Sequence, residues 1–154
     1  MAADGPHEHP GERPHPQPIT LLAIRRTPLS LDEVFQAVGD EAAGGIALFV
    51  GTVRNHDGGV GVDALGYSCH PTAGAEMRRI AEKGVANHPV RALAAVHRVG
   101  ELAVGDTAVV VAVACPHRQD AFAACRQLID DLKREVPIWK HQKFSDGTDE
   151  WVSA

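Results

Sequence analysis

Basic side chains stand at the ends of several apolar or helical segments of the sequence. They are two arginines, two histidines and two lysines: Arg54, His117, Arg118, Lys133, Lys140 and His141. Each one alone is more simply explained as a solvated charge at the end of an element. Together they contrast with a formal net charge of −5, so any anion that the protein binds must meet a local cluster of cations. The grouping predicts a pocket for an anionic, phosphorylated small molecule.

Two of these groups are lysines, which can act as bases or nucleophiles as well as bind anions. A lysine kept among other cations, or beside an apolar ring such as that of Trp139, has a lowered pKa, which favours such a role. Taking Cys125 as the centre of a helical apolar face, a rotation of about 100° per residue places Lys133 about 80° away, at the border of that face. A solvated lysine fits that position equally well. Lys140 follows Trp139 in the segment VPIWKHQ.

His117 and Arg118 follow an apolar run and open a long helical pattern, and helix N-termini favour anions. Other chemistries lack the motifs that they need. The sequence contains no HExxH, P-loop, GxGxxG or GxSxG, which leaves metalloprotease, NTPase, Rossmann and hydrolase functions without support. The three cysteines (Cys69, Cys115 and Cys125) are odd in number and form no CxxC. We therefore interpret them as small buried hydrophobic residues, not as disulfide or zinc ligands.

Extended and helical segments alternate along the chain and must position these groups. Extended segments are expected at 19–24, 44–54, 60–68, 90–100, 107–116, 138–144 and 150–154. The turn sequence NHDGG predicts a β-hairpin over 45–68, and ELAVGD (101–106) is expected to be a turn. The segment 107–116 is apolar and rich in β-branched residues, which is typical of a central strand covered on both faces.

Helices are expected where apolar residues recur with a helical period. Ser30 is a predicted N-cap with Glu33 as its capping-box partner, and a second helix is predicted over 71–87, with a proline in its first turn. The longest helix, 117–136, carries apolar residues at offsets 0, 1, 4, 7, 8 and 11, which form one face, and Pro137 ends it. These elements predict an α+β fold.

The composition predicts one soluble domain. Residues 1–18 are rich in Pro, Gly, His and charge and are expected to form a disordered tail, with 19–154 as a single domain. The negative net charge argues against general nucleic-acid binding. There is no leader sequence and no apolar run of about 18 residues, so a cytoplasmic location is expected.

Three stretches resemble, in order and spacing, the large catalytic subunit of molybdopterin synthase. They are GGIALFVGTVRNHDGGVGVDALGYS, VHRVGELAVGDTAVVVAVACPHRQDAF and LKREVPIWKHQKFSDGTDEWV. The motifs GTVRN, HRxGEL, HRxxAF and LKxxxPIWK are specific in combination, and the similarity extends from about Ile19 to Val152. The resemblance implies an α/β hammerhead fold with additional antiparallel β-strands.

The resemblance also implies a reaction in molybdenum cofactor biosynthesis. In this family a sulfurtransferase converts cyclic pyranopterin monophosphate to molybdopterin by inserting two sulfurs. The sulfurs come from the thiocarboxylated Gly-Gly terminus of a small ubiquitin-like sulfur-carrier subunit, in a heterotetramer built on a homodimer. We expect no metal site and no cofactor in this chain. The order of the two transfers, and which lysine is nucleophile and which acid-base, stay open.

Family roles carry over to this chain residue by residue. The implied substrate-binding residues are Thr52, Val53, Arg54, His117, Arg118, Lys133, Lys140, His141 and Gln142, with Lys133 and Lys140 as the catalytic pair. Trp139 is expected to pack as a buried anchor beside Lys140, in an extended edge segment. Many family members have an acidic residue where this chain has Gln142, and another where it has Ser68. These two differences affect only the finer contacts around the substrate and the tail of the partner subunit.

Two other functions remain as alternatives. A non-catalytic module could hold a phosphorylated pterin or a Gly-Gly tail in the same pocket, although a binder could use arginine at either lysine position. A metal-binding protein could use the nine histidines, including His7, His9 and His15 of the tail.

The helix geometry predicts a shared site. Arg118 and Lys133 are 15 residues apart on one helix, which corresponds to about 22 Å. A pyranopterin monophosphate is roughly half that long, so one chain can hardly bring both residues to it. A symmetric dimer, in which one copy's Arg118 completes the pocket of the other, is therefore expected.

Overall fold

The structure is a computed structural model that describes residues 17–57 and 60–153. One sheet has the strand order β1-β5-β7-β2, in which β1 runs parallel to β5 and the other pairs are antiparallel. Its strands are β1 (Ile19–Arg25), β2 (Gly45–Thr52), β5 (Ala92–Arg98) and β7 (Thr107–Cys115). Most of the predicted tail lies outside the described residues. Pro18, the last residue of that predicted tail, accepts a hydrogen bond from the Leu93 amide at 2.7 Å.

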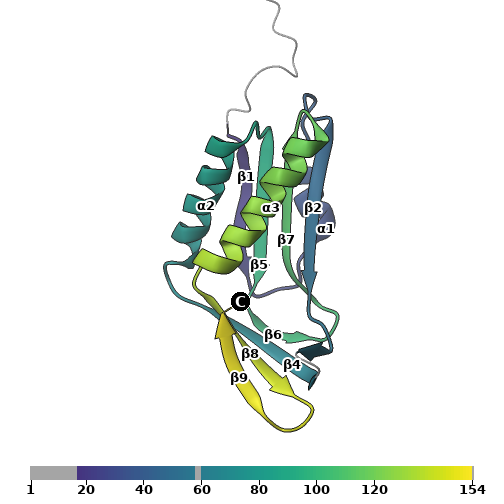
Figure 1. Cartoon of the computed structure of the whole chain (residues 1–154), viewed down its shortest axis with the longest axis vertical. Helices are drawn as coiled ribbons and strands as arrows, with labels where there is room; N and C mark the ends of the chain where they lie inside the picture. Colours follow the sequence, from purple (N-terminus) through teal and green to yellow (C-terminus); the bar gives the residue numbers. More distant parts are fainter. Residues whose placement is uncertain (1–16, 58–59, 154) are drawn as a thin grey trace, which may run out of the picture.

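Helices cover both faces of this sheet, as Figure 1 shows. Helix α1 (Leu31–Ala37) lies on one face, and α2 (Ala73–Asn87) and α3 (Arg118–Glu135) lie on the other. Small and β-branched side chains leave β5 and β7 almost wholly buried, which confirms the predicted central strand. The α+β class is likewise confirmed.

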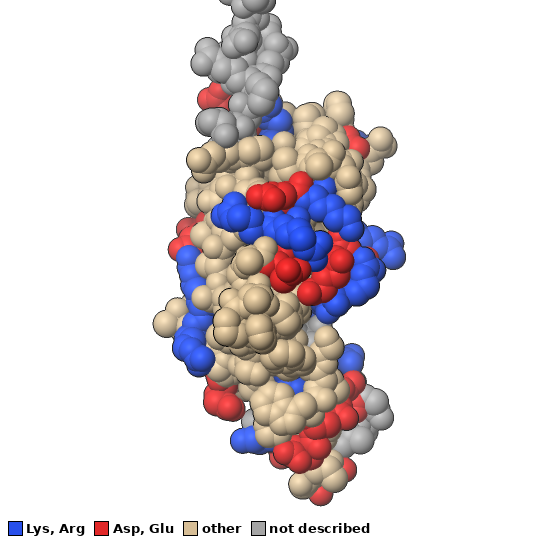
Figure 2. Space-filling model, turned by 90° about the vertical axis from the view of Figure 1, so that its left-hand side faces the viewer, with Lys and Arg blue, Asp and Glu red and all other residues tan. Residues whose placement is uncertain are grey.

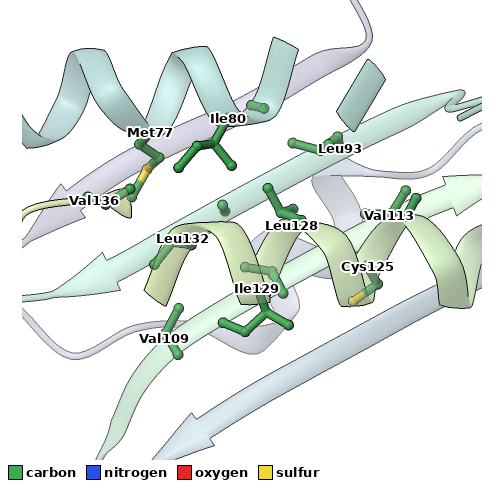
Figure 3. Close-up of a cluster of buried hydrophobic side chains, with 14 of the residues drawn as sticks. Met77, Ile80, Leu93, Val109, Val113, Cys125, Leu128, Ile129, Leu132 and Val136 are labelled. Atoms are coloured by element: carbon green, nitrogen blue, oxygen red, sulfur yellow. The ribbon is translucent and has the colours of Figure 1, made fainter. Parts of the chain in front are cut away.

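The apolar face of the long helix α3 determines its position on the sheet. Leu128, Ile129 and Leu132 belong to the same buried cluster as Met77 and Ile80 of α2 and Val109 of β7 (Figure 3). Deleting side chains of this size from such a core costs about 2–5 kcal/mol each. The helix therefore lies at one fixed place on the sheet.

The predicted caps are only partly formed. The Ser30 hydroxyl accepts the Glu33 amide at 3.1 Å as expected, but the Glu33 carboxylate pairs with Arg25 in place of the cap. Helix α2 begins at Ala73, two residues later than predicted, because Pro71 and Thr72 belong to the preceding turn.

The prediction of a hairpin over 45–68 is wrong. Strand β2 pairs along its length with β7, and β4 (Val60–Cys69) pairs with β6 and β8 in a second sheet. Within the predicted hairpin, only the short strand β3 (His56–Asp57) pairs with the start of β4. The physical reason is that β2 is apolar enough to match the buried β7, so the chain leaves the first sheet after Thr52.

The second sheet corrects three further expectations. The segment predicted as a turn begins with strand β6 (Gly100–Ala103), which pairs with β4. Strand β8 (Ile138–Phe144) lies between β4 and β9 (Asp149–Ser153), so Lys140 is not on an edge strand. Trp139 is 42% exposed, whereas Ile138 is 1% exposed. The buried anchor of this segment is Ile138, because alternate side chains of a strand point to opposite faces.

The cysteines are largely as predicted. Cys115 and Cys125 are buried, and burial raises the pKa of each thiol to about 11. Cys69 is only half-buried, because it lies near the end of β4.

The exposures of Trp139 and Ile138 predict opposite mutational effects. Ile138→Ala should lower the free energy of unfolding by about 3 kcal/mol, because it leaves a cavity in the core. Trp139→Ala should cost less than about 1 kcal/mol. Urea denaturation of the two variants measures both values, and a larger loss for Trp139→Ala would contradict the assignment of Ile138 as the anchor.

Candidate active site

A cavity of about 390 Å³ lies where the end of β2, the strands β4 and β8, and the last turn of α3 meet. We call it the lysine cavity. Its lining consists of Phe49, Val50, Gly51, Thr52, Val53, Arg54, Leu65, Tyr67, Lys133, Lys140 and Gln142. Six of the nine predicted substrate-binding residues are therefore brought together, although they come from two distant parts of the sequence, 52–54 and 133–142.

Two backbone hydrogen bonds fix the chain where it leaves β2. The Val53 amide donates to the Asp106 carbonyl at 3.0 Å, and the Val53 carbonyl accepts the Gly105 amide at 2.7 Å. The Val53 side chain is buried with Leu65. These contacts leave Arg54, whose side chain is 69% exposed, at the mouth of the cavity.

Strand β8 presents alternate residues to the lysine cavity. Lys140 and Gln142 face it, and Lys140 stands opposite Tyr67 of β4 in the strand register. His141 points to the other face, where its ring stacks on Trp151 at 4.5 Å and its Nε2 lies 2.6 Å from the Asp149 carboxylate. His141 is therefore outside the cavity.

Lys133 projects from the last turn of α3 into the same cavity. Burial lowers the pKa of its amino group, and the positive charge of Lys140 lowers the pKa further. The predicted lowering of a lysine pKa by a neighbouring cation is thus found for Lys133. A lowered pKa increases the fraction of neutral amine, the form that acts as base or nucleophile.

The Gln142 side chain, which lines the cavity, is held by two carboxylates. The buried Gln142 amide donates to Asp57 at 2.8 Å and to Glu150 at 3.2 Å, and Arg54 donates to Asp57 at 3.2 Å. The hydrogen bond from Gln142 is the main cause of a lowered Asp57 pKa, with Lys140 and Arg54 adding to it. The nitrogen of the Gln142 amide is therefore committed to protein carboxylates.

Two further residues of this region are absent from the predicted set. His97 is 3% exposed, and its Nδ1 donates to the Arg98 carbonyl at 2.7 Å. Burial, with the charge of Lys133 as a smaller cause, lowers the His97 pKa to about 4. Tyr67 meets this imidazole edge-on, with ring centroids 5.0 Å apart. The HRxGEL motif marks His97 in the sequence, but nothing there shows that it lies behind Tyr67.

His117 and Arg118 lie at the other end of α3, as predicted. His117 is the N-cap residue, and both side chains are exposed. The backbone of Arg118 lies against the start of β2, where a Cβ on Gly45 would be 3.0 Å from the Arg118 Cα. A single copy of the chain thus keeps these two residues away from the lysine cavity.

Several charged side chains on the surface around α2 are paired with one another. On the side covered by α2, Figure 2 shows Lys and Arg side chains interleaved with Asp and Glu. Arg79 pairs with Glu76 and Glu135, and Lys83 with the buried Asp131. Another cavity, of about 400 Å³ near Ile19 and α2, includes one arginine and one glutamate but none of the predicted residues.

Within the described ranges, no group of three or more His, Cys, Asp or Glu side chains could hold a metal ion. The tail histidines lie outside those ranges. No helix of the described chain is long and apolar enough to cross a membrane.

Comparison with known proteins identifies the family. The family described as MoaE protein matches residues 24–135. Molybdopterin synthase catalytic subunit 1 of Mycobacterium tuberculosis is 45% identical over 81% of this chain and 85% of its own length. The molybdopterin synthase structure from Staphylococcus aureus superposes with a TM-score of 0.79 at 31% identity, over 85% of this chain and 96% of its own.

A structure from Helicobacter pylori, a complex of subunits 1 and 2 of molybdopterin-converting factor, shares the fold. Its TM-score is 0.67 at 22% identity, over 86% of this chain and 89% of its own. From the family match and these relatives, we conclude that the chain belongs to the MoaE family, that of the molybdopterin synthase catalytic subunits.

Proposed function

We propose that this chain is a sulfurtransferase that inserts two sulfurs into cyclic pyranopterin monophosphate to form molybdopterin. The observation that carries the proposal is the convergence of Lys133, Lys140 and Arg54 in one cavity of an otherwise acidic protein. The substrate is an anion with a phosphate, and Arg54 at the mouth would hold that phosphate through charge-assisted hydrogen bonds.

The two lysines suit different roles. Lys133, with its lowered pKa, would serve as the base or nucleophile. Lys140, opposite it in the cavity, would stabilise the negative charge that builds up when the carrier's thiocarboxylate is attacked. This division addresses the question that the sequence leaves open, namely which lysine exchanges protons.

The sulfur donor would be the Gly-Gly terminus of a small carrier protein. Glycine has no side chain, so an extended Gly-Gly tail can approach closely in a narrow space. The related Helicobacter pylori structure is itself a complex of two different subunits. We therefore propose that the carrier's tail enters the lysine cavity and brings its terminal sulfur to the two lysines.

A second copy of the chain would complete the site through β2. Among the described strands, only β7 pairs with β2, so β2 is an edge strand of its sheet. The exposed apolar side chains of β2 are Ile46, Leu48 and Phe49, and Phe122 of α3 is exposed as well. Such an apolar edge strand tends to pair with another chain. These residues adjoin an apolar hollow of about 250 Å³.

Antiparallel pairing of two β2 strands would bring the separated residues together. With a twofold axis between Leu48 and Phe49, Gly45 of one copy faces Thr52 of the other. Arg118 packs against Gly45, so each copy would deliver His117 and Arg118 to the other's cavity. The proposed assembly is this homodimer with one carrier on each side, a heterotetramer.

Removing either cavity lysine should abolish most activity without unfolding the protein. We expect Lys133→Ala and Lys140→Ala to lower the rate of dithiolene formation at least about 100-fold, because each removes a group that acts on the reacting atoms. The assay supplies precursor and thiocarboxylated carrier. Lys143→Ala is the matched control, since Lys143 lies on the opposite face of β8. A wild type that binds precursor but forms no product would refute the proposed enzyme.

The pKa of Lys133 can be measured directly. Acylation of single lysines, followed by mass spectrometry across pH, should give Lys133 a midpoint below the ordinary 10.5. Because the positive charge of Lys140 contributes to this lowering, Lys140→Met should move the Lys133 midpoint upward. A downward or absent shift would contradict the assigned electrostatic coupling.

The shared site can be tested by complementation. Arg118→Ala and Lys133→Ala proteins, each inactive alone, should regain part of the activity when mixed under conditions of subunit exchange. A mixed dimer then contains one site with both residues intact. Exchange is verified separately with differently tagged copies, and exchange without recovery would rule out the composite site.

A further inference from the structure

Tyr67 is the only tyrosine of the protein, and it lines the lysine cavity. It lies on β4 directly opposite Lys140 of β8, and side chains paired in this way share one face of a sheet. Its ring also contacts His97, which is close enough to Lys133 for that lysine's charge to lower the His97 pKa. Tyr67 thus shares the cavity with both lysines.

The ring of Tyr67 is held in one orientation. It packs edge-on against the buried imidazole of His97, at an interplanar angle of 79°. His97 is itself fixed by its hydrogen bond to the Arg98 carbonyl, and with a pKa near 4 it stays uncharged at neutral pH. Tyr67 also packs against the buried cluster that contains Leu65 and Val53.

The hydroxyl group of Tyr67 is available to hydrogen-bond with a ligand. Within the described residues it has no hydrogen-bond partner, and burial alone raises its pKa above the ordinary 10.0. The phenol therefore remains protonated at neutral pH and can donate one hydrogen bond. The amide nitrogen of Gln142, by contrast, already donates to two carboxylates.

We propose that the Tyr67 hydroxyl is a further substrate-contacting group, which donates a hydrogen bond to an oxyanion bound between Lys133 and Lys140. The inference rests on the proposed function in requiring an anion in the lysine cavity. Two sources offer that chemistry: the phosphate of the precursor and the terminal carboxylate or thiocarboxylate of the carrier. The lysines attract an anion as point charges, whereas a hydrogen bond from a neutral hydroxyl also fixes the orientation of the bound anion.

The variant Tyr67→Phe removes only the hydroxyl and keeps the ring against His97. Calorimetric titration at low salt should show about tenfold weaker binding of inorganic phosphate, or of a peptide ending in Gly-Gly, than the wild type shows. Loss for phosphate alone assigns the hydroxyl to the precursor, and loss for the peptide alone assigns it to the carrier tail. Ser68→Ala is the matched control, because Ser68 lies next to Tyr67 on β4 but points to the opposite face.

The thermal midpoint of Tyr67→Phe should equal that of the wild type, since the hydroxyl has no hydrogen-bond partner in the part of the chain that the structure describes. Near-ultraviolet absorption adds a readout in the unmutated protein: a bound anion should shift the band of the single tyrosine. Equal affinities for both anions in wild type and Tyr67→Phe, or anion binding without a tyrosine shift, would overturn the inference and leave the proposed function standing. A wild type that binds neither anion would overturn both.

Discussion

The burial of one face of α3 against β2 and β7 is the contact on which the candidate site depends. Leu128, Ile129 and Leu132 set the rotation of the helix on the sheet. This rotation turns Lys133 to the border between core and solvent, where its amine meets the cavity. The same contact places Arg118 against the start of β2. One packing interaction therefore determines where both parts of the proposed composite site lie.

The charge of the cavity is opposite in sign to the net charge of the protein. Three cations line it, while the chain as a whole is acidic. Such a cluster is costly without an anion, because like charges at short range repel one another. Asp57 relieves part of this repulsion, and the buried amide of Gln142 holds it in place. An acidic side chain at position 142 would instead lie among Asp57 and Glu150, so the amide suits this particular arrangement.

The cavity lies where the two sheets meet, and each sheet contributes to the site in a different way. The first is covered by helices on both faces and supplies rigidity. The second, formed by β4, β8 and their neighbours, carries Tyr67 and Lys140 in register. Ile138 anchors β8 to the core immediately after α3 ends, which keeps Lys140 close to Lys133. Neighbouring side chains on β8 then divide between the cavity and the outer face, where His141 and Trp151 stack.

The sequence by itself determined the helices, the central strand and the basic residues at segment ends, because these follow from local periodicity and residue chemistry. It identified Lys133, Lys140 and Arg54 through their motifs. It did not determine that β2 pairs with β7 instead of β4, since strand pairing depends on contacts between segments far apart in the chain. Nor did it determine that Ile138, not Trp139, is buried, that His141 faces away, or that Tyr67 lines the cavity of both lysines and packs on His97. Only the tertiary structure decides these points, because the face that a strand residue presents depends on which strands lie beside it.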